Sequence, residues 1–202
     1  MDNRLRILKD VAMMFKDSGI RSVTMEHIST ELGISKRTLY EIFSDKDDLV
    51  KQVIEEGVKA HKEFCTKAIE TSENVIEAIF KIGQLNVEMY HKINPIFFDD
   101  LRKFHSNIFK KIQEKDGIKD ISITKSLFEI GIKDGLFSSD LNIEIVNIFI
   151  HKVFDFIYED ELKVFQNQDL TNSILLPYFN GICTQKGKDL INKYLDIFNF
   201  YK

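Results

Sequence analysis

Residues 24–50, TMEHISTELGISKRTLYEIFSDKDDLV, decide the fold of the N-terminal part of this chain. Apolar residues recur at helical spacing in two short runs: Met25, Ile28 and Leu32 in the first, then Leu39, Ile42 and Phe43 in the second. Thr24 and Ser35 are favourable N-caps for the two helices, and Gly33 can adopt the left-handed conformation that ends the first. Two short helices joined by a Gly-containing turn are typical of a helix-turn-helix, which indicates DNA binding.

The outward face of the second short helix carries the side chains expected of a recognition helix. At 100° per residue, Arg37 and Glu41 lie opposite the apolar stripe, flanked by Thr38 and Tyr40, and Lys36 stands at the helix start. Arg37 is suited to pair with O6 and N7 of a guanine, while Thr38 and Tyr40 suit phosphates or a thymine methyl group. A solvated polar face is the alternative, but an exposed aromatic such as Tyr40 argues for a partner.

The residues that follow predict a phosphate site at the start of the next helix. Ser44 and Asp47 have the S-x-x-D spacing of a capping box, and Lys46 lies between them. Free amides at a helix N-terminus attract phosphate, and a cation beside them strengthens the attraction. The complete set of candidate DNA-contacting residues is Thr24, Ser35, Lys36, Arg37, Thr38, Tyr40 and Lys46.

This segment resembles the DNA-binding domain of the TetR family of bacterial transcriptional regulators. The residues in register with the family pattern are Thr24, Ile28, Leu32, Gly33, Ile34, Ser35, Thr38, Leu39, Tyr40, Phe43, Lys46 and Leu49. Two positions depart from the pattern: Arg37 stands where a small residue is common, and Ser29 replaces an alanine. The resemblance implies an all-α protein, with a three-helix DNA-binding domain at 1–46 and a larger helical domain for effector binding and dimerisation at 47–202.

Outside this segment, the apolar spacing predicts further helices. They cover residues 3–17, 45–69, 72–92 capped by Ser72, 95–115 closed by Gly117, 122–133, 142–166, and 170–200 with a kink at Pro177. The stripe on 3–17 is expected to pack on the helix-turn-helix. The first half of 142–166 is apolar nearly all round, which indicates burial on more than one side.

The resemblance also implies a homodimer, in which two C-terminal helices of each subunit form a four-helix bundle. The apolar surplus at 142–158 and 170–182 supports this placement, and symmetric dimers are the commonest oligomers. The predicted interface comprises Val146, Ile150, Val153, Ile157, Ile174, Tyr178 and Ile182. Two recognition helices would then reach half-sites about 34–36 Å apart, so a palindromic operator is expected.

Family members usually hold a small molecule inside the second domain, between helices that correspond here to residues 72–134. Aromatic and polar residues that could line such a pocket are Phe80, Asn86, Tyr90, His91, Phe97, Phe98, Phe104 and Phe128. The alternative is that these aromatics only fill the core. The abundance of phenylalanine favours an apolar or aromatic effector.

Composition excludes several other classes of protein. The net charge of −4 gives no overall basic footprint, so DNA binding would depend on local cations. Two isolated cysteines, no signal-peptide pattern and no long apolar run predict a cytoplasmic protein that does not span a membrane. Catalytic and dinucleotide motifs are absent from the sequence, so neither an enzyme nor a cofactor is expected. Acidic and histidine residues at Glu88, His91, Asp99, Asp100 and His105 are better explained as solvated charge than as metal ligands.

The sequence therefore predicts a DNA-binding regulator, expected to be a repressor, that a small effector releases by tilting residues 45–69. A DNA-binding structural or protein-interaction factor without an effector is the alternative. A helical enzyme or carrier that kept only the shape of the N-terminal domain is a third hypothesis.

Overall fold

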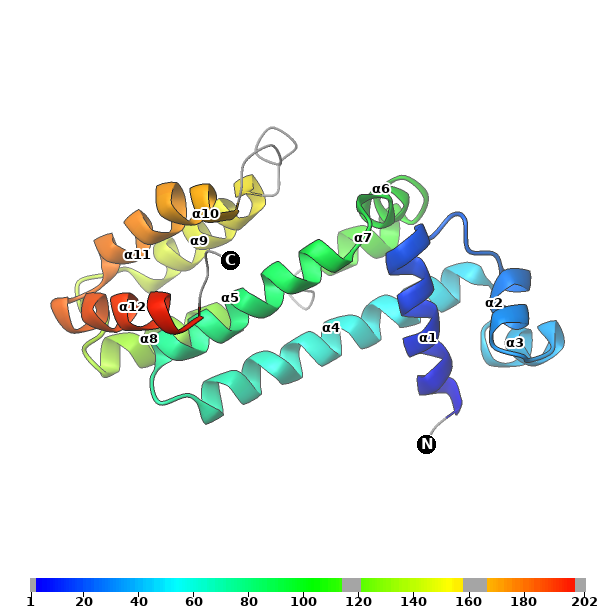
Figure 1. Ribbon diagram of the computed structural model, residues 1–202, viewed down its shortest axis with the longest axis horizontal. Coiled ribbons are helices and arrows are strands. Elements are labelled where there is room, and N and C mark those ends of the chain that lie inside the picture. The colour runs from blue at the N-terminus through cyan, green and yellow to red at the C-terminus, as the bar shows by residue number, and fades with distance from the viewer. Residues whose placement is uncertain (1–2, 114–120, 158–166, 199–202) are drawn as a thin grey trace. The chain divides into compact units, whose positions relative to one another are not determined.

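The protein is described by a computed structural model that covers residues 3–113, 121–157 and 167–198. In this part of the chain the regular secondary structure is helical, apart from one isolated bridge between Phe137 and Cys183. The helices are α1 (Asn3–Ser18), α2 (Met25–Glu31), α3 (Lys36–Ile42), α4 (Lys46–Thr71), α5 (Val75–Lys92), α6 (Pro95–Phe104), α7 (Ser106–Gln113), α8 (Ile121–Lys133), α9 (Ile143–Ile157), α10 (Asn167–Leu170), the π-helical turn η2 (Thr171–Leu175), α11 (Leu176–Ile182) and α12 (Gln185–Phe198) (Figure 1). The all-α prediction is confirmed.

Local capping explains where the first helices begin and end, as predicted. Thr24 Oγ1 accepts a hydrogen bond from the backbone N–H of His27 at 3.1 Å, and Ser35 Oγ accepts one from Thr38 at 3.0 Å. Between them Gly33 has a φ of +62°, a conformation that side chains with a Cβ rarely adopt. The helix-turn-helix is therefore encoded by its two caps and its turn glycine.

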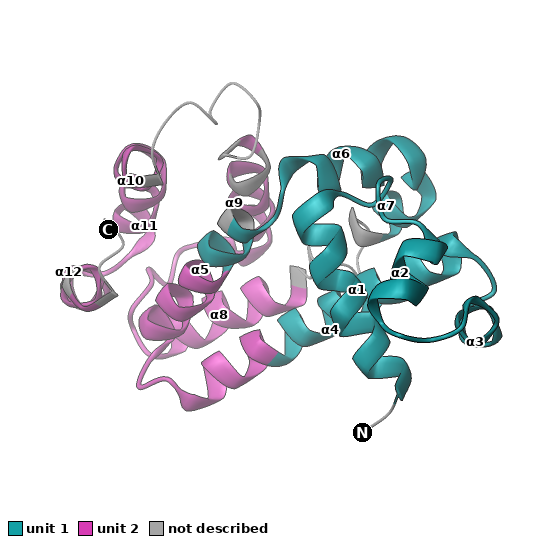
Figure 2. Cartoon of the chain, turned by 45° about the vertical axis from the view of Figure 1, so that its right-hand side comes forward, with its two compact units in different colours: residues 1–63, 86–118 teal, residues 64–85, 119–202 magenta. Residues whose placement is uncertain are grey.

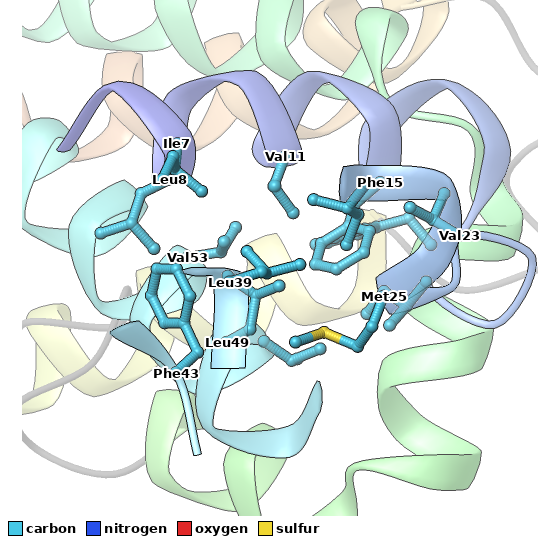
Figure 3. Close-up of a cluster of buried hydrophobic side chains, with 14 of the residues drawn as sticks. Ile7, Leu8, Val11, Phe15, Val23, Met25, Leu39, Phe43, Leu49 and Val53 are labelled. Carbon is cyan, nitrogen blue, oxygen red and sulfur yellow. The ribbon is translucent and has the colours of Figure 1, made fainter. Parts of the chain in front are cut away.

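A single apolar core holds α1, α2 and α3 against the start of α4 (Figure 3). Its completely enclosed members are Ile7, Val11, Phe15, Ile20, Ile28, Leu39, Phe43, Leu49 and Val50. The stripe predicted on residues 3–17 thus packs on the helix-turn-helix. Helix α6 contributes Phe97 and Leu101 to the same core, although more than 40 residues of sequence lie between it and α3. Burial of these side chains is the main stabilising contribution to the N-terminal fold.

The capping box at the start of α4 lies one residue later than predicted. Asp45, not Ser44, accepts a hydrogen bond from the N–H of Asp48, at 2.8 Å. The Asp48 carboxylate in turn accepts one from the N–H of Ser44, at 3.0 Å. Asp47 is therefore free of the capping role that the S-x-x-D spacing gave it.

Two other helix boundaries differ from the prediction. Helix α5 is capped by Asn74, whose Oδ1 accepts from the N–H of Glu77 at 3.1 Å, while Ser72 Oγ donates to a carbonyl of the preceding helix. The single helix predicted for 95–115 is two helices, because His105 leaves the helical conformation at φ −127° and ends α6. Gly117 lies outside the described residues.

The kink predicted at Pro177 takes the form of a π-helical turn. The N–H of Leu176 bonds to the carbonyl of Thr171, five residues back, within η2. Proline lacks an N–H and clashes with the preceding turn of a regular α-helix, and a wider turn relieves both problems. Gly181 lies one residue before the end of α11, and Gly187 lies inside the first turn of α12.

The chain packs as two compact units, and both α4 and α5 have residues in each (Figure 2). The first unit comprises residues 1–63 and 86–118, and the second comprises 64–85 and 119–202. The first unit therefore contains α6 and α7 in addition to the helix-turn-helix. The functional boundary at residue 46 stays a prediction.

Candidate nucleic-acid interface

Helix α3 presents a polar face on a rigid support. Leu39 and Phe43 are completely buried, which fixes the rotation of the helix about its axis. Lys36, Arg37 and Tyr40 are exposed on the other side, and Tyr40 keeps 45% of its surface accessible. An aromatic ring and two cations are thus held at the surface of one short helix, as the sequence predicted.

Carboxylates partner both cations of this face. Arg37 Nε lies 2.9 Å from Glu41 Oε1, one turn along α3, and Lys36 Nζ lies 3.7 Å from Glu26 Oε2 on α2. All four side chains are more than half exposed, so water screens these pairs and each contributes little to stability. Both cations can therefore exchange these partners for phosphates or bases. Glu41 was not among the predicted contact residues.

Thr24, Ser35 and Thr38 surround the two helix starts. Besides its capping bond, Ser35 Oγ lies 2.8 Å from Thr38 Oγ1. Thr24 and Ser35 are exposed, and Thr38 is half-buried. Their hydroxyl groups are occupied within the protein, so any contact with DNA would be additional to a structural role.

The Lys46 ammonium group bonds to backbone carbonyls of its own chain, whereas a simple phosphate contact would extend into solvent. Its Nζ donates to the Ile20 carbonyl at 2.7 Å and approaches the Arg21 carbonyl at 3.4 Å. Burial lowers the pKa of the Lys46 ammonium, while the Asp100 and Asp47 carboxylates oppose that shift. The ammonium group therefore anchors the segment between α1 and α2.

The described aromatic members of the predicted pocket set belong to two different compact units. Phe80 and Phe128 are buried in the core of the second unit, and Phe97 is buried in the core of the first. Phe98 is half-buried, whereas Phe104 is 52% exposed and lies under the Arg21 guanidinium, 5.1 Å from its ring centre. For Phe80, Phe97 and Phe128, the core-filling alternative fits the observed burial.

Of the polar residues in that set, only the side chain of Asn86 lies in the described part of the structure. Asn86 Oδ1 lies 2.8 Å from His61 Nε2 on α4, a partner that the sequence did not suggest. The side chains of Tyr90 and His91 lie outside the described part of the structure. An open surface hollow of about 420 Å³ is lined instead by Lys16, Asp17, Lys92, Ile93, Asn94 and Pro95.

The predicted dimer residues lie mostly on the inner side of their helices. Ile150, Val153 and Ile182 are enclosed in the core of their own chain, which leaves them almost no surface for a partner. Val146, Ile174 and Tyr178 are half-buried, and the side chain of Ile157 is not described. The apolar side chains that α9 exposes are different ones: Ile145, Ile148, Phe149 and Phe156. The predicted interface on α9 therefore stays a prediction, and its members Ile150 and Val153 are buried within their own chain.

Other classes of site find no support in the described residues. Within them, no group of three or more histidine, cysteine, aspartate or glutamate side chains could hold a metal ion. Of the residues weighed as ligands, Asp100 bonds instead to the backbone of Arg21. None of the described helices is both long and apolar enough to cross a membrane.

Comparison with known proteins identifies the family of the N-terminal domain. Residues 7–53, which contain the helix-turn-helix, match the family described as bacterial regulatory proteins, tetR family. The uncharacterised HTH-type transcriptional regulator YvaF of Bacillus subtilis is 28% identical over 192 residues, which cover 91% of this chain and 97% of that protein. The HTH-type transcriptional repressor KstR2 of Rhodococcus jostii is 22% identical over 73% of this chain and 74% of its own length.

A solved structure has the same fold along nearly the whole chain. The fatty acid degradation regulator FadR from Bacillus halodurans superposes with a TM-score of 0.62 at 14% identity, covering 98% of this chain and 95% of FadR. The capped helix-turn-helix, the helical second unit and the similarity to regulators along the chain agree with one another. The relatives are transcriptional regulators and not enzymes, and this protein carries the DNA-binding domain of the TetR family on a chain that resembles such regulators along most of its length.

Proposed function

We propose that α3 is a recognition helix that enters the major groove of a double-stranded DNA operator. The observation that carries this proposal is the exposed row of Lys36, Arg37 and Tyr40 on a helix whose opposite side is anchored in the core by the completely buried Leu39. Arg37 has 90% of its side chain exposed, so its guanidinium can reach guanine O6 and N7 without a change in the fold. Thr24, Ser35 and Thr38 flank this helix as candidate phosphate contacts, whereas Lys46, which the sequence placed in the same set, acts as an internal anchor through the Ile20 carbonyl.

We further propose that the protein acts as a homodimer through the outer face of α9. Ile145, Ile148 and Phe149 are more than half exposed there, and Phe156 continues the same face two turns further along the helix. Exposed apolar side chains that repeat along one helix face favour a partner chain. A two-fold axis would present two α3 helices to half-sites about 34–36 Å apart, which is the reason to expect a palindromic operator.

Repression released by an apolar effector is the regulatory mode we propose. Two relatives support it through their names: KstR2 is a transcriptional repressor, and FadR is a regulator of fatty acid degradation. The cytoplasm is the compartment in which such a protein would meet DNA. An effector-free DNA-binding factor is the second candidate, because Phe80, Phe97 and Phe128 are packed into apolar cores.

Selection from a library of duplexes with a randomised stretch of about 25 base pairs tests the DNA proposal. The full-length protein should enrich a palindromic sequence, and its affinity for that sequence should fall steeply with salt. Arg37→Ala and Tyr40→Ala should each weaken the preference for this sequence and leave the oligomeric state unchanged. Arg102→Ala, an exposed arginine on α6, is the matched control and should retain it. Equal binding to all duplexes, or an unchanged preference in Arg37→Ala, would refute the assignment of α3.

Effector binding can then be tested on the selected duplex. Candidate effectors are fatty acids, from the name of FadR, and ketosteroids, because KstR2 of Mycobacterium tuberculosis is a ketosteroid transcriptional regulator. An effector from either class should raise the unfolding midpoint of the protein and release it from DNA, because a ligand stabilises the state that it binds. If all compounds of both classes leave DNA binding unchanged, and denaturing extraction releases no small molecule, the effector-free alternative is favoured.

A further inference from the structure

The segment between α1 and α2, residues 19–23, is held by a buried carboxylate from a distant helix. Asp100 on α6 is only 7% exposed, and its Oδ2 accepts a hydrogen bond from the backbone N–H of Arg21 at 2.7 Å. The two residues are 79 positions apart in sequence. A carboxylate is costly to bury unless it is hydrogen-bonded, so this contact contributes to the stability of the fold.

Glycine at position 19 allows α6 to approach this closely. Gly19 has a φ of +80°, and a Cβ added to it would lie 2.6 Å from Ile96 Cγ2 and 2.9 Å from Asp100 Oδ2. Real Cβ atoms do not approach other atoms so closely, so a larger residue would displace the Ile96 and Asp100 side chains from their positions against the segment. The Asp100 carboxylate therefore occupies space that is available only because residue 19 has no side chain.

Two more contacts hold the same segment. Lys46 Nζ donates to the carbonyl of Ile20 at 2.7 Å from the start of α4. On α6, Phe104 lies under the Arg21 guanidinium at 5.1 Å. Residues 19–23 are thus held by α6 through Asp100 and by α4 through Lys46.

This segment sets the position of the proposed DNA interface. It leads directly into Thr24, the N-cap of α2, and Lys46 follows α3 by only four residues. The position of α2 on one side and of the α3–α4 junction on the other therefore depends on how the segment is held. Small displacements matter here, because base contacts require hydrogen-bond geometry to be met at several points at once.

We propose that Asp100 is a positioning residue for operator binding: it acts from α6, without touching DNA, by fixing the Arg21 backbone and with it the start of α2. This inference rests on the proposed DNA-binding function. It assigns to α6, a helix that the sequence placed outside the DNA-binding domain, a direct part in shaping the interface.

Charge alone predicts the opposite effect, which makes the inference testable. Removing a carboxylate from a DNA-binding protein should tighten its binding slightly, wherever that carboxylate lies. Asp99 is the neighbouring residue on α6 and is exposed, so Asp99→Asn makes the same charge change without touching the segment. Asp100→Ala should weaken binding to the library-selected duplex about tenfold or more, a loss on the scale of one hydrogen bond to a charged group. Asp100→Asn keeps an acceptor oxygen and should fall between wild type and Asp100→Ala.

A second pair of variants tests the contact from its other side. Gly19→Ala should displace the segment through the clash at Asp100 and Ile96 and should weaken selective binding as Asp100→Ala does. Gly135→Ala is the matched control, because Gly135 also has a positive φ of +68° but a Cβ there meets nothing within 4 Å. It should carry the same backbone strain and keep the affinity of the wild type for the selected duplex.

The decisive experiment compares these five variants with wild type at a temperature where circular dichroism shows all of them folded. Affinity for the selected duplex and for a scrambled duplex is measured, together with hydrogen exchange of the peptide that contains Arg21. The expected result is a loss of selective affinity and faster exchange in Asp100→Ala and Gly19→Ala, with Gly135→Ala unchanged and Asp99→Asn binding as tightly as wild type or slightly more tightly. Wild-type affinity in folded Asp100→Ala, or an equal loss in Asp99→Asn, would overturn the proposal while leaving the DNA-binding function intact. If the wild type itself selects no duplex, the proposed function has failed, and this inference fails with it.

Discussion

Arg37 and Glu41 form an ion pair on the outward face of α3, with Nε and Oε1 2.9 Å apart. Arginine can donate hydrogen bonds to guanine O6 and N7 from its two terminal nitrogens. A carboxylate bonded to Nε leaves both of these nitrogens available. The pair is exposed and weak in water, but it biases the guanidinium toward one orientation before DNA arrives. Exclusion of water at a protein–DNA interface would strengthen it.

This relationship predicts that Arg37 and Glu41 act as a unit in base discrimination. Arg37→Ala should remove the preference at one base pair of the selected site, about 1–3 kcal/mol. Glu41→Gln should weaken the preference at the same base pair, and the double variant should be no worse than Arg37→Ala alone. Relative affinities for all single-base variants of the site provide the measurement. Glu31→Gln, an exposed carboxylate on α2, controls for the charge change. A Glu41 effect at a different base pair would mean that Glu41 reads a base by itself.

The two roles considered for Lys46 predict different salt dependences. A phosphate contact contributes about one unit to the slope of log affinity against log salt concentration, whereas an internal anchor contributes nothing to it. Because Lys46 Nζ is bonded to the Ile20 carbonyl, Lys46→Met should lower operator affinity and leave the slope unchanged. Lys36→Met, on the exposed end of α3, should reduce the slope by about one and serves as the comparison. An equal reduction of the slope in Lys46→Met and Lys36→Met would show that Lys46 contacts a phosphate.

The outer stripe of α9 predicts a variant that is monomeric but folded. Phe149 is 52% exposed and its ring lies 5.3 Å from that of Tyr178, so Phe149→Glu removes one ring contact within the chain and would place a carboxylate in a dimer interface. Analytical ultracentrifugation should show dissociation at micromolar concentration with unchanged helical content. Met13→Glu makes a similar change at an apolar residue of α1 that is 58% exposed, and it should not alter the mass. A dimer that survives Phe149→Glu together with Ile145→Glu would place the interface elsewhere.

The sequence predicted those parts of the fold that neighbouring residues determine. Thr24, Gly33 and Ser35 act on backbone within four residues of themselves, so their consequences can be read from spacing alone. The Asp100–Arg21 contact could not be predicted in this way, because it depends on how α6 packs on α1.

The dimer face was ambiguous for another reason. The first half of α9 is apolar nearly all round, so periodicity could not decide which stripe faces its own core. Val153 and Ile150 turned out to be inside, and Phe149 outside. Residue type could not decide the position of the effector pocket either, because an aromatic side chain such as Phe97 can fill a core or line a cavity.

Cys183 allows a prediction that concerns pH. Burial raises the pKa of the Cys183 thiol to about 11 from an ordinary value of 9.0. At pH 8 its thiolate fraction should therefore be about a hundredfold lower than that of an ordinary cysteine, and modification by a disulfide reagent should be slow until the protein unfolds. The sign of the stability effect follows from proton binding. Between pH 9 and pH 11 the folded state retains a proton that the unfolded state releases, so stability is present below pH 9 and declines as the pH rises.

A comparison of Cys183→Ala with wild type isolates this contribution. The free energy of unfolding of the wild type should decrease more steeply between pH 9 and pH 11, by at most about 3 kcal/mol, because the other titrating groups are common to both proteins. Cys65→Ala provides a reference, since Cys65 is also buried and its replacement leaves Cys183 in place. Cys183 lies in the same core cluster as Ile182 and Leu136, so burial should protect its thiol. Parallel pH profiles for wild type and Cys183→Ala would contradict this protection. Rapid thiol modification of the folded Cys65→Ala variant at pH 8 would contradict it as well.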